Sequence, residues 1–140
     1  MRFRDEFEMI LNRDDFKELE FDHMDGSEVA DNPDVDVYTT LFEVEEDDVP
    51  YLAQIVFEPE DLVADVCIAK PIKHFLSVEV LRKVNAYNCE SRFCKLSTEE
   101  GMLSLKASLW KAEGVEALMD MLFMCMDSAT ETFPEFESDK

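Results

Sequence analysis

Residues Ser77–Phe133 read SVEVLRKVNAYNCESRFCKLSTEEGMLSLKASLWKAEGVEALMDMLFMCMDSATETF, and they carry the strongest structural signals in this 140-residue chain. Ser77 is a residue type that often caps the start of a helix, and the apolar spacing after it predicts a helix to about Asn88. Alternating apolar and polar residues on both sides of a glycine turn then predict a hairpin of two strands, Arg92–Ser97 and Met102–Trp110. The second of these strands is expected to keep one face in water.

A long helix is predicted to begin at Gly114 or Val115 and to end at the proline that follows residue 133. Its apolar residues recur at the i, i+3, i+4 and i+7 spacing of a core-facing helix. Met121, Met124 and Cys125 widen this stripe beyond a single face. Two explanations are open for so broad an apolar surface: it is enclosed within one chain, or a partner covers it.

The first half of the chain is expected to hold a helix, an acidic loop and three strands. These are, in order, Phe3–Asn12, His23–Asp36, Val37–Val44, Tyr51–Phe57 and Leu62–Ala69. The links between the strands are too short to contain a crossover helix, so the strands should form an antiparallel meander.

The predicted element order is therefore α-β-β-β-α-β-β-α. This order indicates an α+β fold in which helices cover one face of a five-stranded antiparallel sheet. A chain of this length fits one domain, expected over residues 1–134. Residues 135–140 are expected to form a frayed acidic tail.

Charge limits the partners that this chain can have. It carries 34 acidic and 13 basic residues, with a formal net charge of −21, most of it within residues 1–61. Such a chain repels nucleic acids and anionic lipids, so no nucleic-acid partner is expected. No apolar run reaches the roughly 18 residues of a membrane span, and the start of the chain lacks the apolar segment of a signal peptide. We therefore expect a cytoplasmic protein with no membrane partner.

No catalytic motif is recognisable. The two histidines, His23 and His74, have no nucleophile pattern near them, and no G-x-S-x-G, phosphate-loop or H-E-x-x-H motif occurs. The four cysteines have no metal-ligand spacing and are interpreted as small, reduced hydrophobic residues. The Met-rich last helix and the acidic clusters are interpreted as packing and solvation, and not as Cu(I) or Ca²⁺ sites. We expect no enzymatic activity, no metal and no cofactor.

One segment resembles a known family. The sequence VEVLRKVNAYN at Val78–Asn88, followed by a strand containing Phe93, a glycine turn and an apolar strand to Trp110, resembles the YbjN-like family of bacterial sensory transduction regulators. The element order, small size and acidity are similar to the fold of type III secretion chaperones, which that family shares. The resemblance covers about residues 36–133 in element order. It implies a homodimer that binds another polypeptide or acts as a regulatory adaptor, without enzymatic activity.

Within the matched segment, Leu81, Asn85 and Asn88 form an L-x-x-x-N-x-x-N motif. Asparagine side chains near a helix end usually bond nearby backbone groups or adopt the left-handed cap conformation. Peptide binding is the second interpretation of these two asparagines.

The leading hypothesis is a non-enzymatic, acidic protein-binding module that takes up a polypeptide in apolar grooves, with its carboxylates favouring a basic partner. The alternative is a small-ligand or metal-ion sensor that uses the acidic N-terminal half. Adaptation to high salt, in which the acidity serves solvation, is a third hypothesis. The residues expected at a dimer or partner interface are Val80, Val84, Tyr87, Met121, Met124 and Cys125.

Overall fold

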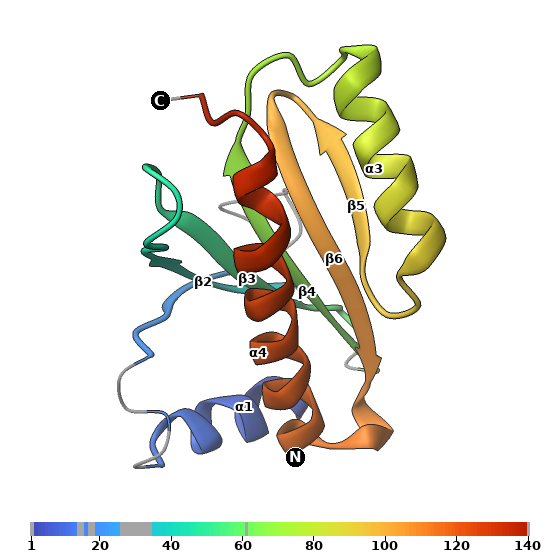
Figure 1. The fold of residues 1–140 in the computed structure, drawn as a ribbon. Helices are drawn as coiled ribbons and strands as arrows, with labels where there is room; N and C mark the ends of the chain where they lie inside the picture. The colour runs from blue at the N-terminus through green and yellow to red at the C-terminus, as the bar shows by residue number, and fades with distance from the viewer. Residues whose placement is uncertain (1, 14–15, 17–18, 26–34, 61, 140) are drawn as a thin grey trace.

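A computed structural model describes residues 2–13, 16, 19–25, 35–60 and 62–139, in which an antiparallel sheet packs against helices (Figure 1). This confirms the predicted α+β class. The helices are α1 (Phe3–Leu11), α3 (Val78–Glu90) and α4 (Val115–Thr132), with 3-10 turns η2 (Lys111–Glu113) and η3 (Phe133–Glu135). The strands are β1 (Asp22–Asp25), β2 (Asp36–Phe42), β3 (Tyr51–Phe57), β4 (Val63–Pro71), β5 (Lys95–Glu99) and β6 (Met102–Trp110).

The sheet has six strands and not the five that the sequence predicts, in the order β1-β2-β3-β4-β6-β5. Every neighbouring pair is antiparallel, so the meander and the hairpin are both as predicted. The additional strand is β1, which pairs with β2 and places His23 opposite Tyr38. It lies within the stretch that was expected to be a loop, because its four residues lack the alternating apolar pattern on which strand prediction depends. Residues 26–34 of that expected loop lie outside the described residues.

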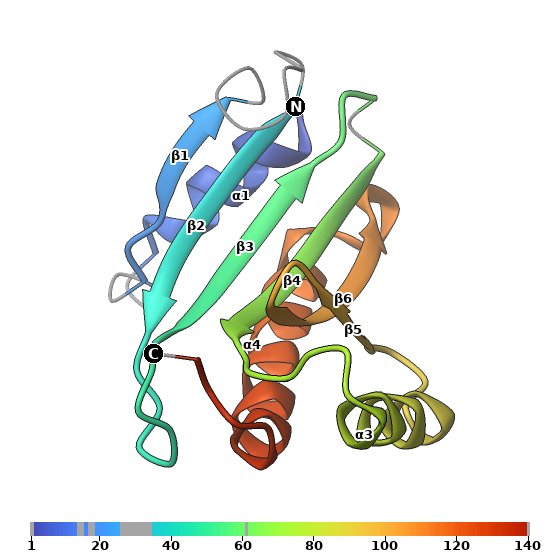
Figure 2. The same cartoon turned by 90° about the horizontal axis from the view of Figure 1, so that it is seen from above.

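Helices α1 and α4 pack on the same face of the sheet (Figure 2). In β3 every second residue is buried on this face, as its alternating sequence predicts. The helices contribute apolar residues at helical spacing. Two phenylalanine rings of α1 pack in edge-to-face geometry against aromatic rings of the sheet, Phe3 against Phe57 and Phe7 against Tyr38. The buried residues that α1, β3 and α4 contribute to this core include Phe3, Phe7, Ile10, Tyr51, Ala53, Ile55, Phe57, Leu118, Met119, Leu122 and Ala129.

Helix α3 lies beside β5 at the end of the sheet and does not cover its face (Figures 1 and 2). Ser77 caps it as predicted, because its Oγ accepts a hydrogen bond from the Val80 amide at 3.2 Å. None of the residues of α3 is buried. The apolar spacing of this helix predicts that Leu81 faces inward with Val80, Val84 and Tyr87, and that prediction is wrong. Leu81 is exposed, because at the sheet edge the helix contacts the core along a narrow line.

The C-terminal tail is ordered over residues 135–139, which corrects the prediction that it frays. Phe136 is buried, and Ser138 forms a β-bridge with Ile72. The Lys73 amide donates to the Glu137 carbonyl at 2.9 Å, and the Asp139 amide donates to the carbonyl of Pro71 at 3.1 Å. The tail therefore extends the sheet locally beyond the end of β4.

Candidate binding site on the uncovered face of the sheet

One face of the sheet carries no helix among the described residues, and strand register identifies its side chains. Residues directly opposite each other in antiparallel strands share a face. Gln54 is opposite Cys67, and Cys67 is opposite Lys106, so these three form one row. Their neighbours along the strands, such as Val66, are buried toward α1 and α4. The row therefore lies on the face that α1 and α4 leave open.

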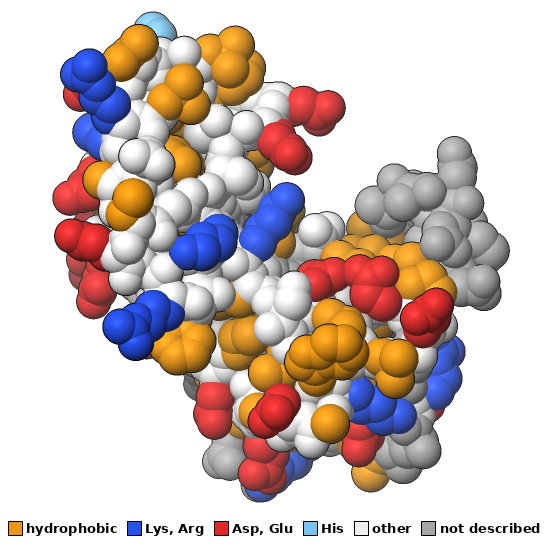
Figure 3. Space-filling model, turned by 90° about the vertical axis from the view of Figure 1, so that its right-hand side faces the viewer, with side chains coloured by type: hydrophobic (Ala, Val, Ile, Leu, Met, Phe, Trp, Pro, Cys, Tyr) orange, Lys and Arg blue, Asp and Glu red, His pale blue; other side chains and the backbone are white. Residues whose placement is uncertain are grey.

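This uncovered face is hollowed. The hollow has a volume of about 480 Å³, and its apolar lining includes Leu52, Val56, Ala69 and Met102. Figure 3 shows the hollow from one side, with basic side chains along one wall, hydrophobic side chains along the other and acidic side chains at the rim of both. Its size is within the range of about 300–1,000 Å³ that is usual for ligand sites.

A pair of carboxyl groups lies beside the hollow. Asp65 lines it and accepts a hydrogen bond from Ser108 Oγ at 2.5 Å. A hydrogen bond with Asp65, followed by burial, raises the pKa of the Glu58 carboxyl to about 7. Two carboxyl groups this close together favour the approach of a cationic group.

One large apolar side chain, that of Trp110, extends the same face beyond the carboxyl pair. Trp110 is opposite Val63 and lies two residues after Ser108, which places its side chain on the uncovered face. Trp110 and the adjacent Leu62 are 63% and 52% exposed, and the Lys111 amide bonds the Leu62 carbonyl at 2.8 Å. Exposed tryptophan next to an apolar hollow is a typical anchor of protein interfaces.

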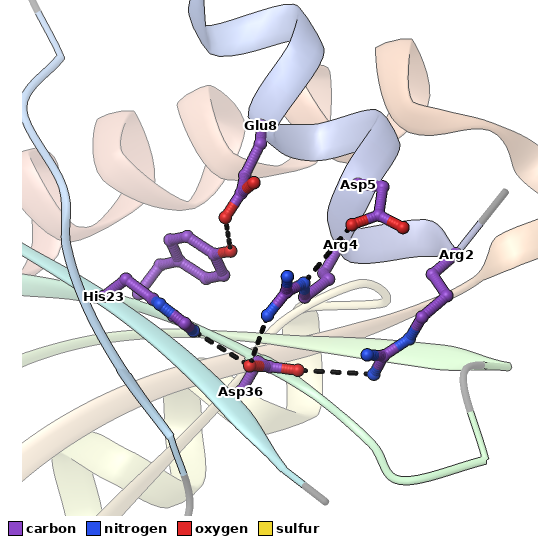
Figure 4. Close-up of polar contacts among 7 residues, drawn as sticks. Arg2, Arg4, Asp5, Glu8, His23 and Asp36 are labelled. Carbon is purple, nitrogen blue, oxygen red and sulfur yellow. Dashed lines mark hydrogen bonds and ion pairs between the residues drawn. The ribbon is translucent and has the colours of Figure 1, made fainter.

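A second polar cluster, which the sequence did not reveal, holds the first turn of α1 against the sheet (Figure 4). Asp36, at the start of β2, accepts hydrogen bonds from Arg4 Nη1 at 2.9 Å and Arg2 Nη2 at 3.3 Å. His23 Nε2 lies 2.8 Å from the same carboxylate, and the His23 ring stacks on Tyr38. This cluster connects α1, β1 and β2, so its role is to position the N-terminal helix.

The electrostatics of this cluster favour the charged form of Asp36. Burial by itself raises the pKa of the Asp36 carboxyl, but the hydrogen bonds from His23 and Arg4 outweigh it and lower the pKa below its ordinary value. Burial and then the hydrogen bond to Glu8 raise the pKa of Tyr38. Tyr38 therefore stays a neutral donor to Glu8 over the whole physiological range.

A third cluster surrounds Lys70, whose side chain has no exposed surface. Its Nζ donates to Asp47 Oδ2 at 2.5 Å, to the Phe136 carbonyl at 2.8 Å and to Ser138 Oγ at 2.8 Å. Asp47 also accepts from Tyr51 and from Ser138, both at 2.8 Å. Burial lowers the pKa of Lys70, and Asp47 opposes that effect. Since every ammonium hydrogen is bonded, the cluster anchors the C-terminal tail and is not a free reactive amine.

The predicted interface residues lie in two different environments. Val80, Val84 and Tyr87 of α3 are partly buried against the core. In α4, Met121 and Cys125 are buried and Met124 is partly exposed. The broad apolar face of α4 is thus enclosed within one chain at Met121 and Cys125, which is the first of the two explanations that the sequence left open.

The residues of the asparagine motif also lie in two different environments. Asn88 bonds Leu96 at the start of the hairpin twice: its amide nitrogen donates to the Leu96 carbonyl at 2.9 Å, and its oxygen accepts from the Leu96 amide at 2.7 Å. This backbone contact agrees with the structural interpretation of Asn88. Asn85 is exposed on α3, as is Leu81.

Two further searches concern the described part of the chain. No group of three or more His, Cys, Asp or Glu side chains is arranged there to hold a metal ion. None of its helices combines the length and the apolar character that crossing a bilayer requires.

Comparison with known proteins gives no relative: no family model, no curated protein and no solved structure matches this chain. The YbjN-like resemblance therefore stays a prediction, and function is argued from the site.

Proposed function

We propose that this chain is a non-enzymatic, chaperone-like or regulatory adaptor, and that it binds a segment of another polypeptide on the uncovered face of its sheet. The observation that carries the proposal is the apolar hollow of about 480 Å³ on that face, with exposed Trp110 beyond it. The YbjN-like resemblance and its implied homodimer agree with this role, and we propose both with it.

The mechanism follows from the side chains around the hollow. An apolar side chain of the partner enters the hollow and loses water, which contributes about 25 cal/mol per Å² of buried apolar surface. Trp110 covers the adjoining part of the segment as an anchor. The Glu58 and Asp65 carboxyls then select a basic residue at this end, and the overall negative charge speeds its approach.

A selection of displayed random peptides on the immobilised protein tests this function. Ser104 lines the hollow on β6, whereas Asp127 is exposed on α4, which packs on the opposite face of the sheet. We expect Ser104→Trp to weaken the selected peptides by about tenfold or more, which is about 1.4 kcal/mol. Asp127→Trp, the control, should bind as the wild type does. If the selected peptides bind Ser104→Trp as tightly as the wild type, the hollow is not part of the binding site.

The second candidate function is a small-ligand sensor that uses the same hollow. Gln54, Cys67 and Ser104 place polar groups among its apolar walls, which is the usual composition of a small-molecule site. A metabolite that raises the unfolding temperature of the wild type and not of Ser104→Trp, with no peptide enriched, would favour this function.

A further inference from the structure

Two of the four cysteines lie against each other in the interior. The Sγ atoms of Cys94 and Cys125 are 3.6 Å apart, and neither residue is more than 3% exposed. Cys67 is partly buried on the uncovered face of the sheet, and Cys89 is exposed on α3. All four are free thiols. The contact at van der Waals distance distinguishes Cys94 and Cys125 from the other two.

The pair joins elements that are far apart in the sequence. Cys94 directly precedes β5, and Cys125 lies 31 residues later on the buried side of α4. Ser91 holds Cys94 in place, since its Oγ donates to the Cys94 carbonyl at 2.7 Å and accepts from the Cys94 amide at 3.3 Å. A disulfide requires the sulfur atoms to approach by about 1.5 Å, to about 2.05 Å. Cys94 lies between the bend at residues 92–93 and β5, outside any helix or strand.

We propose that Cys94 and Cys125 form a modification site, at which a small two-electron thiol oxidant converts the two thiols into a disulfide. With diamide, an azodicarboxamide, the Cys94 thiolate adds to one nitrogen of the N=N bond. The Cys125 thiolate then attacks Cys94 Sγ, which forms the S–S bond and breaks the S–N bond. The two thiol protons end on the two nitrogens, so the azo group is reduced to a hydrazine as the cysteines lose two electrons.

The environment assigns the order of the two steps. Burial raises the pKa of the Cys125 thiol, and the adjacent Cys94 raises it further. Because the thiolate is the nucleophile, Cys125 reacts slowly with an oxidant in solution. It is suited to the second step, in which the activated Cys94 sulfur is already in contact with it. The reaction therefore accelerates as the pH rises.

The cross-link acts on the edge of the sheet where α3 lies. No residue of α3 is buried, and its attachment to β5 includes the two hydrogen bonds between Asn88 and Leu96. A disulfide from Cys94 to Cys125 ties this edge to α4. It also restricts the unfolded chain by closing a loop of 31 residues. Oxidation thus stabilises the edge of the sheet where α3 lies.

A peptide map of the full chain tests the site. The native protein is treated with diamide, then unfolded, alkylated with iodoacetamide and digested with trypsin. Cleavage after lysine and arginine places the four cysteines in separate peptides, 18–73, 84–92, 93–95 and 112–140. We expect peptide 93–95 to be joined to 112–140 and to separate with dithiothreitol. Alkylation of both Cys94 and Cys125 after prolonged oxidation, or a link to 18–73 or 84–92 in its place, would overturn the proposal.

Stability gives an independent measurement. Diamide should raise the unfolding temperature of the wild type by about 5 °C or more, as closure of a loop of this length predicts. Cys94→Ser should abolish the shift, and the double variant Cys67→Ser/Cys89→Ser should retain both the shift and the link. An equal shift in Cys94→Ser contradicts the proposal. If Cys94→Ser fails to fold, the map of the double variant still decides, because only Cys94 and Cys125 remain to react.

Discussion

Replacing Lys70 with methionine tests how far the C-terminal tail depends on one buried charge. Lys70 bonds Asp47 and two groups of the tail, and its side chain has no exposed surface. Its loss leaves the Asp47 carboxylate buried without a counter-charge. Removing one partner of a buried ion pair usually lowers the free energy of unfolding by about 3–5 kcal/mol. Urea unfolding measures that loss.

Lys73→Met is the matched control for this change. Lys73 also contacts the tail, with its Nζ 3.5 Å from the Glu137 carboxylate, but both side chains are largely exposed. Solvent screens such a pair, so the substitution should change the free energy of unfolding by less than about 1 kcal/mol. Equal losses of unfolding free energy in the two variants would show that burial does not determine how much Lys70 contributes to stability.

Glu58 should make stability depend on pH close to neutrality. Its hydrogen bond with Asp65 and then its burial raise its pKa from 4.5 to about 7. The folded chain thus binds this proton more tightly than the unfolded chain does. The contribution of Glu58 to stability is full below about pH 4.5 and is lost as the pH rises through about 7.

The Asp65→Asn variant should remove this dependence, because the asparagine amide can donate to an ionised Glu58. The measurements are urea unfolding between about pH 5 and about pH 8 and a carboxyl carbon-13 NMR titration. Asp120→Asn, at an exposed position on α4, is the control that should leave the dependence unchanged. A wild-type midpoint for Glu58 near 4.5 would contradict the raised pKa of this carboxyl.

At the scale of elements, the predictable parts are those whose signal is local. The α4 stripe and the β3 alternation follow from side-chain period alone, and both occur close to the predicted positions. The same reasoning predicted that β6 keeps one face in water, and alternation places Ser104, Lys106 and Ser108 on that face. It could not predict the hollow on that face, because the hollow depends on how the strands twist relative to one another.

The elements that were missed are held by contacts distant in sequence. Strand β1 depends on pairing with β2 and on the His23–Asp36 contact, and the tail depends on Lys70, which is 66 residues before Phe136. One signal was visible: Lys70 occupies a position of β4 that alternation assigns to the core. A lysine there requires a partner, although the sequence does not identify Asp47 as that partner.

For the whole molecule, the distribution of charge determines which surface can meet a second copy. The outer side of α4 carries Glu116, Asp120, Asp127 and Glu131 around Met124, and two such surfaces repel each other. The outer side of α3 is different, because its charges are of both signs and it exposes Val78 and Leu81, with exposed Leu76 just before the helix. Self-association through α3 therefore buries apolar surface without bringing like charges together.

Light scattering at micromolar concentration in physiological salt tests this arrangement. We expect a mass of two chains for the wild type and of one chain for Leu81→Glu, since the new carboxylate would lose its water in the interface. Met124→Glu is the matched control, because Leu81 and Met124 are 45% and 37% exposed. The sequence placed Met124 among the interface residues, but the acidic residues around it lead us to expect that this variant stays dimeric. A monomeric Met124→Glu with a dimeric Leu81→Glu would place the interface on α4. A wild type of one-chain mass at every concentration would mean that the exposed side of α3 is free to bind a different protein.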